Sequence, residues 1–135
     1  MIRCLLVLCC LLFAGCSASA PIVEGTVTLN GQPVDGGVIT LQPLAGTTGA
    51  NVGGDIKAGK FRLADRSSPA VGKHRAEIRW VRKTGRQVPV PTNPNGSERI
   101  DEIGETIPEK YNTQSTLEMD VQPGVNRVEW KLTTQ

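Results

Sequence analysis

The chain has few aromatic side chains and little excess charge. Phenylalanine, tryptophan and tyrosine together make up 4% of its 135 residues, so a core must be built mainly from aliphatic side chains. The formal net charge of +2 is too small to indicate nucleic acid as a partner. No window of eleven or more residues shows a convincing 3.6-residue apolar repeat, which leaves β-strands as the expected elements of one domain.

Motifs of catalysis and of metal binding are also missing. The chain has a single histidine, His74, whereas a zinc or copper site needs several such ligands. It has no G-x-S-x-G elbow, no S-x-x-K motif, no glycine-rich phosphate loop and no calcium loop. We therefore expect no enzyme activity, no cofactor and no metal. His74 alternates with Ala76 and Ile78, which predicts a partly buried core side chain.

Cysteine is confined to the first sixteen residues. Arg3 precedes an unbroken apolar run over residues 4–13, which is too short to cross a bilayer of about 30 Å but suits a secretory signal peptide. The run ends in LFAGC, at residues 12–16. This ending resembles a bacterial lipobox, in which the cysteine, here Cys16, is acylated and becomes the new N-terminus. The alternative is a plain signal peptide that is cut within the ASA segment at residues 18–20.

The lipobox predicts three regions. Residues 1–15 would be a lipoprotein signal peptide, residues 16–21 a short tether, and residues 22–134 the folded domain. After cleavage Cys16 would be the remaining cysteine, so no disulfide could form within the chain. Each acyl CH₂ buried in a membrane contributes about 0.8 kcal/mol, so several chains on Cys16 would bind membrane lipid stably. The expected location is the cell envelope, with the protein anchored and facing the periplasm or the exterior.

Short segments with period-2 apolar alternation predict half-buried strands. Turn residues separate them, for example Asn30-Gly31 and Ala58-Gly59. Residues 45–54 predict a loop or a weak edge strand, and the last two segments, on either side of Pro123-Gly124, predict a terminal hairpin. Turn signals every 8–12 residues or so favour a β-sandwich of about seven strands. The alternating segments lie at residues 23–29, 38–41, 61–63, 73–82, 117–121 and 128–132.

Residues 83–112 are too long for an ordinary connection and are predicted to be a surface excursion. Their first half is rich in proline, and their second half is acidic. Just before and within them, basic residues gather at residues 73–86. The solvated face of a half-buried strand is the favoured explanation of these basic residues. We further hypothesise that the acidic run folds back over the basic strand as a lid and neutralises it.

The basic strand and a nearby tyrosine supply the ligand-binding candidates. Tyr111 is also expected to cap the sandwich, with its ring packed inward and its hydroxyl at the rim. The candidates for ligand binding are Arg75, Arg79, Trp80, Arg82, Lys83 and Tyr111.

The pattern as a whole resembles a known family. The opening VEGTVTLNGQPVDGGVITLQP at residues 23–43, the DIKAGKFRL segment at residues 55–63 and the GKHRAEI strand at residues 72–78 are similar to the carboxypeptidase regulatory-like domain found in small bacterial lipoproteins. Asp55, Gly59, Phe61 and Gly72 match that pattern, and His74 stands where the family usually has tyrosine. The resemblance implies an all-β, transthyretin-like sandwich with Greek-key, immunoglobulin-like topology. It also implies a structural or binding module without catalytic residues.

These inferences lead to one expected function and two alternatives. The first is a non-catalytic, lipid-anchored module of the cell envelope that is structural or holds an envelope protein. The second is a binder of anionic polysaccharide through the basic strand at residues 73–86. The least favoured is an accessory subunit of an envelope hydrolase.

Overall fold

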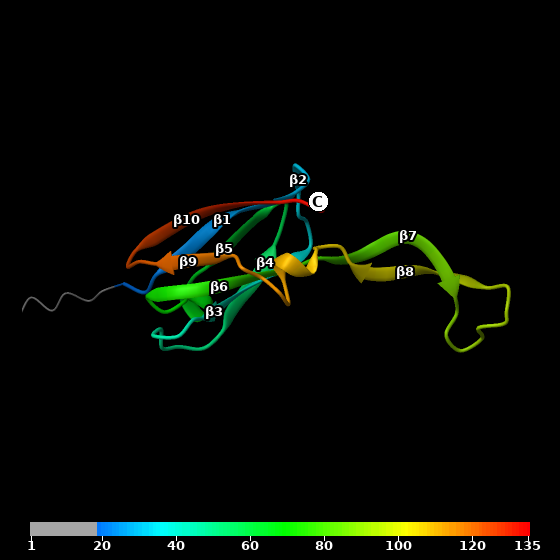
Figure 1. The fold of residues 1–135 in the computed structure, drawn as a ribbon, viewed down its shortest axis with the longest axis horizontal. Coiled ribbons are helices and arrows are strands. Elements are labelled where there is room, and N and C mark those ends of the chain that lie inside the picture. Colours follow the sequence, from blue (N-terminus) through cyan, green and yellow to red (C-terminus); the bar gives the residue numbers. More distant parts are fainter. Residues whose placement is uncertain (1–18) are drawn as a thin grey trace, which may run out of the picture.

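The computed structural model describes residues 19–135 and shows an all-β chain, which confirms the predicted class. Two four-stranded sheets face each other, and a two-stranded ribbon projects from one end of this body (Figure 1). The expected signal peptide and Cys16 lie outside the described residues. Within residues 19–135, no helix has both the length and the apolar character needed to cross a membrane.

The first sheet, sheet A, is organised around the opening strand β1. This strand pairs in parallel with the last strand of the chain and antiparallel with two others. It ends where Asn30 and Gly31 adopt positive φ angles of 49° and 82°, as their residue types favour. The strands of sheet A are β1 (Ile22–Leu29), β2 (Gln32–Pro33), β5 (Lys60–Leu63) and β10 (Val125–Leu132).

The second sheet, sheet B, has the strand order β4-β3-β6-β9 and is antiparallel throughout. Its strands are β3 (Gly37–Pro43), β4 (Val52–Ile56), β6 (Gly72–Arg79) and β9 (Glu118–Val121). The predicted alternation in β6 is confirmed, because His74, Ala76 and Ile78 are fully buried while Arg79 is exposed. Residues 45–54 were expected to form a loop or a weak edge strand. Their last residues belong to β4, which lies at the edge of sheet B.

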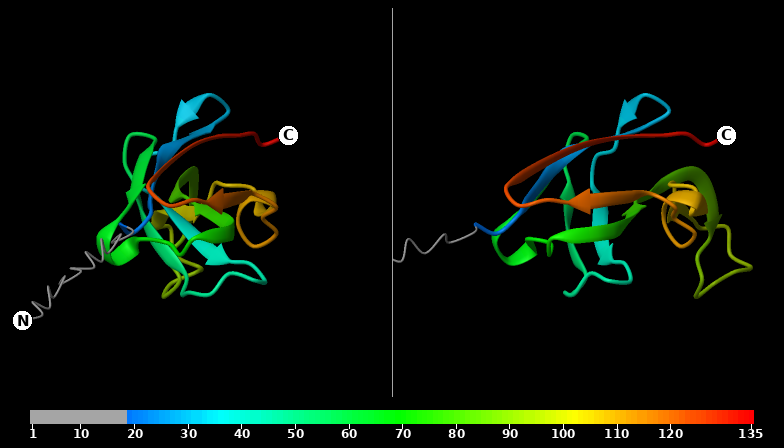
Figure 2. Two further views of the ribbon diagram at one scale, coloured as in Figure 1. Left: turned by 90° about the vertical axis from the view of Figure 1, so that its left-hand side faces the viewer. Right: turned by 60° about the vertical axis from the view of Figure 1, so that its left-hand side comes forward.

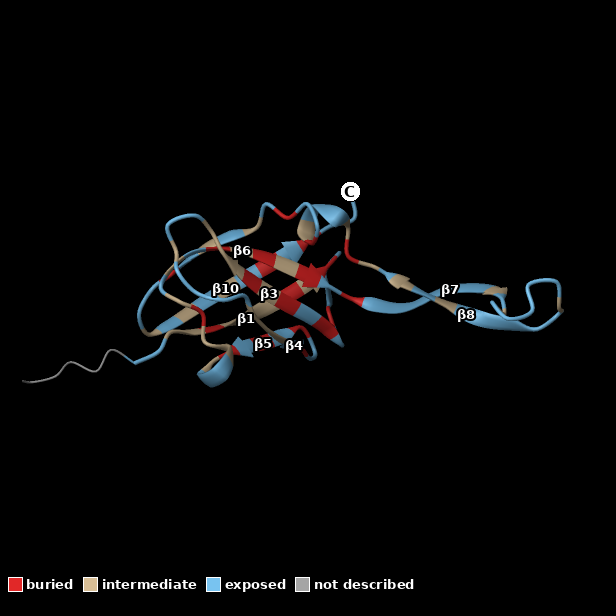
Figure 3. Cartoon of the chain, turned by 90° about the horizontal axis from the view of Figure 1, so that it is seen from below, coloured by how far each residue is buried: buried red, intermediate tan, exposed pale blue. Residues whose placement is uncertain are grey.

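The core lies between the two sheets and is mainly aliphatic. Figure 2 shows the sheets from two further directions, and Figure 3 shows buried residues along β3 and β6. Its aromatic side chains are Trp80 and a parallel stack of Phe61 and Trp130, with ring centroids 5.8 Å apart and planes at 9°. Gly25 pairs with Phe61 on one side and with Val128 on the other. A side chain at Gly25 would place its Cβ 2.1 Å from the carbonyl oxygen of Val128, so β10 can approach this closely because β1 has glycine there.

The predicted terminal hairpin is wrong. β9 pairs with β6 in sheet B, whereas β10 pairs with β1 in sheet A. The turn between them is real, with Gly124 at a φ of 86°, but it carries the chain from one sheet to the other. Turn residues determine where the chain reverses, and a strand with one buried face fits either sheet.

His74 is more deeply buried than the sequence predicts. Its side chain is fully enclosed, and Nδ1 lies 3.0 Å from the carbonyl oxygen of Gly72. Since a carbonyl only accepts, Nδ1 carries the proton and Nε2 is the acceptor. Among the described residues Nε2 has no hydrogen-bond partner. The imidazole is therefore part of the core, with one unsatisfied nitrogen.

Candidate functional site

The long excursion is an ordered β-hairpin, which we call the arm. It consists of β7 (Val81–Pro89) and β8 (Arg99–Glu105), paired antiparallel with a register shift between Lys83 and Gln87. The arm extends away from the sandwich, and almost all of it is exposed on both faces (Figure 3). The chain then returns to the body through the short 3₁₀ helix η2 (Glu109–Tyr111).

The arm exposes apolar side chains. In the described part of the chain, six large hydrophobic side chains are exposed, and three of them are on the arm. These three are Val81, Ile100 and Ile103, at 58%, 42% and 67% exposure. An isolated two-stranded ribbon is only marginally stable in water. The exposed apolar side chains of the arm could be buried by a binding partner.

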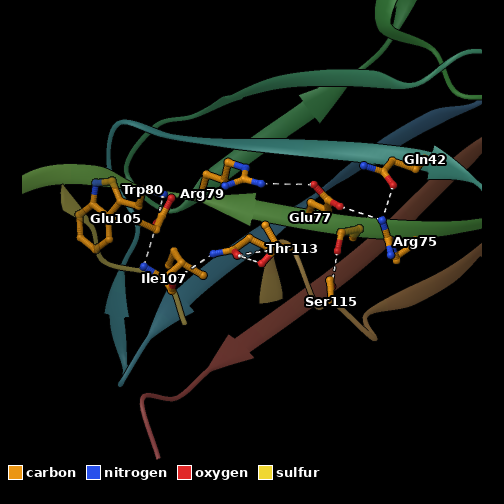
Figure 4. A network of polar contacts seen from close by, with 11 residues as sticks. Gln42, Arg75, Glu77, Arg79, Trp80, Glu105, Ile107, Thr113 and Ser115 are labelled. Carbon is orange, nitrogen blue, oxygen red and sulfur yellow. Dashed lines mark hydrogen bonds and ion pairs between the residues drawn. The ribbon is translucent and has the colours of Figure 1, made fainter. Parts of the chain in front are cut away.

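The root of the arm is fixed to the sandwich by Trp80, which links β6 to β7. Its ring is 9% exposed, and its indole N–H donates to the carbonyl oxygen of Asp35 at 2.6 Å. Its backbone N–H donates to Oε1 of Glu105 at 2.8 Å, and the same oxygen accepts from the backbone N–H of Ile107 at 2.9 Å (Figure 4). The Arg82 guanidinium lies 4.2 Å from the Trp80 ring centroid. One carboxylate therefore joins the two strands of the arm where they leave the body.

The charges of the arm pair with one another across its two strands. Lys83 Nζ lies 2.6 Å from the Asp101 carboxylate, and an Arg86 nitrogen lies 3.8 Å from Glu102. The Lys83 ammonium lowers the pKa of Asp101 below its ordinary value, and the Asp101 carboxylate raises the pKa of Lys83, in both cases chiefly through their hydrogen bond. Both side chains face solvent, so the pair positions the strands more than it stabilises the fold.

Two cations of β6 share one carboxylate of the same strand. Arg75 lies 2.9 Å from one oxygen of Glu77 and also donates to Gln42, while Arg79 lies 3.8 Å from the other oxygen of Glu77 (Figure 4). Glu77 stands between them on the outer face of sheet B, and its side chain is only 13% exposed. The predicted folding back of the acidic run is confirmed at the end of the basic run, where Asp101 and Glu102 pair with Lys83 and Arg86. The predicted lid over β6 is wrong, because the hairpin projects from the sandwich and Arg75 and Arg79 pair with Glu77.

Tyr111 lies where the sequence predicts a cap. Its ring packs against the core, and its hydroxyl oxygen accepts from the backbone N–H of Thr133 at 3.2 Å. Hydrogen bonds to Thr133 lower the pKa of the Tyr111 phenol below its ordinary value. The hydroxyl is thus used to fix the C-terminal strand.

The six predicted ligand-binding residues do not line one pocket. Arg75 and Arg79 lie on the outer face of sheet B, Trp80 and Arg82 at the root of the arm, and Lys83 on the arm itself. Tyr111 is at η2, outside the arm.

The hollows found in the described residues are instead on sheet A, beside Lys60 and Arg62 of β5. Sequence reasoning missed them because the pairing of β5 and β10 with β1 brings their residues together, and no local pattern reveals that pairing.

Nothing in the described residues gathers three or more histidine, cysteine or acidic side chains into a set that could hold a metal ion. Comparison of the chain with protein-family models, with curated proteins and with solved structures gives no match.

Proposed function

We propose that this chain is a non-catalytic, lipid-anchored module of the cell envelope that holds a protein partner through its arm. The observation that carries the proposal is the arm itself. It is an exposed ribbon with three of the six exposed large apolar side chains of the described residues, namely Val81, Ile100 and Ile103. We further propose that its sandwich belongs to the transthyretin-like, carboxypeptidase regulatory-like class. The facing sheets and the turn at Ala58-Gly59, with φ angles of 49° and 74°, support that assignment.

The placement of the two ends supports the anchoring part of the proposal. The described chain begins at the end of the sandwich opposite the arm (Figure 1). Five residues lie between Cys16 and the start of β1 at Ile22, so the six steps from Cys16 to Ile22 span at most about 20 Å when extended. A lipid on Cys16 would therefore hold the sandwich close to a membrane with its arm directed away from it.

The chemistry of the arm suits a protein better than a glycan. Its cations at Lys83 and Arg86 are already paired with Asp101 and Glu102, so they offer little net charge to an anionic ligand. The apolar side chains and the outer edges of β7 and β8 remain available. A partner strand can add hydrogen bonds along such an edge while apolar contacts supply affinity. An envelope hydrolase that is assisted by this chain would be one such partner.

Two measurements test the proposal. The Cys16→Ser variant should move from the membrane fraction to the soluble fraction, and metabolic labelling with palmitate should be lost. Recovery of wild-type protein in the soluble fraction with an unmodified N-terminus would contradict the anchor.

The arm is tested by the double variant Ile100→Ser, Ile103→Ser in a pull-down from detergent-solubilised envelope. The matched control is Val71→Ser, Val125→Ser, which removes exposed apolar side chains outside the arm. We expect the arm variant to lose a protein that both wild type and control retain. Equal recovery by all three would count against the arm as the binding surface.

A further inference from the structure

A groove crosses the outer face of sheet A, and nothing above assigns it a role. It consists of two hollows of about 360 and 350 Å³ on either side of β5, and both are lined by Lys60 and Arg62. The first hollow adds Glu24 and Arg127, from the two strands that pair in parallel, and the second adds Lys57 from the turn before β5. We call these two hollows together the sheet A groove.

The groove is positively charged. Four cations line it against two carboxylates, Glu24 and Asp55, which gives a local charge of +4 − 2 = +2. The formal net charge of the whole chain is also +2, so the charged residues outside the groove sum to zero. The cations are Lys57, Lys60, Arg62 and Arg127.

Glu24 holds the two arginines in place. Arg62 lies 2.6 Å from one of its carboxylate oxygens, and Arg127 lies 3.1 Å from the other. Each of these contacts uses one nitrogen, which leaves further guanidinium N–H groups free to donate. Lys57 and Lys60 form no ion pair with any described residue. Their charges are thus available to a ligand, in contrast to the β6 arginines, which share Glu77.

From this geometry we propose that the sheet A groove binds an acidic oligosaccharide. The cations lie along two adjoining hollows, so they fit a linear ligand with repeated carboxylate or sulfate groups better than a single small anion. Single-stranded nucleic acid binds by stacking its bases on exposed aromatic rings, and the aromatic residue of this groove, Phe61, is 5% exposed. The choice of a glycan rests in part on the proposed envelope location, whereas the site itself does not depend on the arm.

The proposed binding site for an anionic ligand lies on a different surface from the one that the sequence predicts. Sequence reasoning favours the strand at residues 73–86, where the cations are densest along the chain. In the fold, Arg75 and Arg79 are committed to one carboxylate, and Lys83 and Arg86 are paired across the arm. Lys73 and Arg82 form no ion pair with a described residue, but they line neither hollow. The four cations Lys57, Lys60, Arg62 and Arg127 gather in the sheet A groove instead.

The test measures binding of oligogalacturonate at low salt by isothermal titration calorimetry, with maltoheptaose as the neutral probe and oligothymidylate as the nucleic-acid probe. The groove variant is Lys57→Gln, Lys60→Gln, which breaks no ion pair of the described chain and so spares folding. The matched control is Lys73→Gln, Arg79→Gln, with the same change in charge on β6. We expect the groove variant to raise the Kd for oligogalacturonate by about tenfold and the control to raise it by less than about twofold.

Several outcomes would overturn the proposal. These are no oligogalacturonate binding by wild type, an equal loss in both variants, a loss in the β6 variant alone, and equally tight binding of maltoheptaose or oligothymidylate. The arm variant Ile100→Ser, Ile103→Ser should bind oligogalacturonate like wild type. Failure of glycan binding with a retained arm partner would reject the groove and leave the proposed function standing.

Discussion

Removal of the Glu105 carboxylate tests how the arm is attached. In the Glu105→Ala variant, the backbone N–H groups of Trp80 and Ile107 lose the oxygen that they share at 2.8 and 2.9 Å. Trp80 and Ile107 are both buried, so water replaces the lost acceptor poorly. Hydrogen bonds to a charged acceptor contribute about 1.5–3 kcal/mol each when buried, and the exposure of Glu105 lowers that value. We expect a loss of about 2 kcal/mol in the free energy of unfolding.

The assay is urea unfolding followed by circular dichroism, together with limited trypsin digestion. Trypsin should cut the Glu105→Ala protein faster at Arg82 and Lys83, because the arm detaches more often. Glu105→Gln keeps a carbonyl oxygen that accepts the same bonds, and it should lose less than about 1 kcal/mol. Glu129→Ala, which removes an exposed carboxylate of β10, should stay within about 0.5 kcal/mol of wild type. Wild-type stability together with a wild-type digestion rate for Glu105→Ala would show that the Glu105 carboxylate does not attach the arm to the sandwich.

Three further predictions follow from the core and the arm. Gly25→Ala should lose about 3 kcal/mol or more in urea unfolding, because the new Cβ would lie 2.1 Å from the carbonyl oxygen of Val128, and wild-type stability would contradict the close β1–β10 approach. His74→Leu removes the buried Nε2, which has no partner among the described residues, together with the Nδ1 hydrogen bond to Gly72. We expect a gain of about 1 kcal/mol in the same assay, and a loss would show that the bond to Gly72 outweighs the cost of burying Nε2. Asp101 has a lowered pKa in the folded chain. The stabilisation of the arm by its carboxylate is therefore present above the ordinary aspartate pKa, and it is lost as the pH falls through the lowered pKa. Amide exchange in the arm should therefore quicken between about pH 5 and pH 2 in wild type, and Asp101→Asn should lack that change.

The sandwich could be predicted from sequence where each strand buries one face. In β6, His74, Ala76 and Ile78 alternate with charged residues, and burial on one side enforces that pattern. The turns at Asn30-Gly31 and Ala58-Gly59 were also predictable, since asparagine and glycine accept the positive φ angles found at Asn30, Gly31 and Gly59. Local chemistry fixes these features, so local sequence reveals them.

The arm could not be predicted in the same way. Both of its faces are exposed, so no burial period marks its strands, and its proline-rich tip suggests a loop. What aligns it is a set of cross-strand contacts such as Lys83 with Asp101, whose partners are far apart in the sequence. The pairing of Glu77 with Arg75 and Arg79 was predictable, because residues two apart in a strand share a face. The sheet A groove was not, since it needs the pairing of β1 with β5 and β10.

The parallel pairing of β1 with β10 has a consequence for synthesis. The first strand of the domain borders the last along its whole length, from Ile22 opposite Val125 to Leu29 opposite Leu132. Sheet A therefore stays open until β10 has left the ribosome, and contacts of such long sequence separation form slowly. Until then β1 has an unpaired side along its full length, and such a side can pair with a strand of another copy.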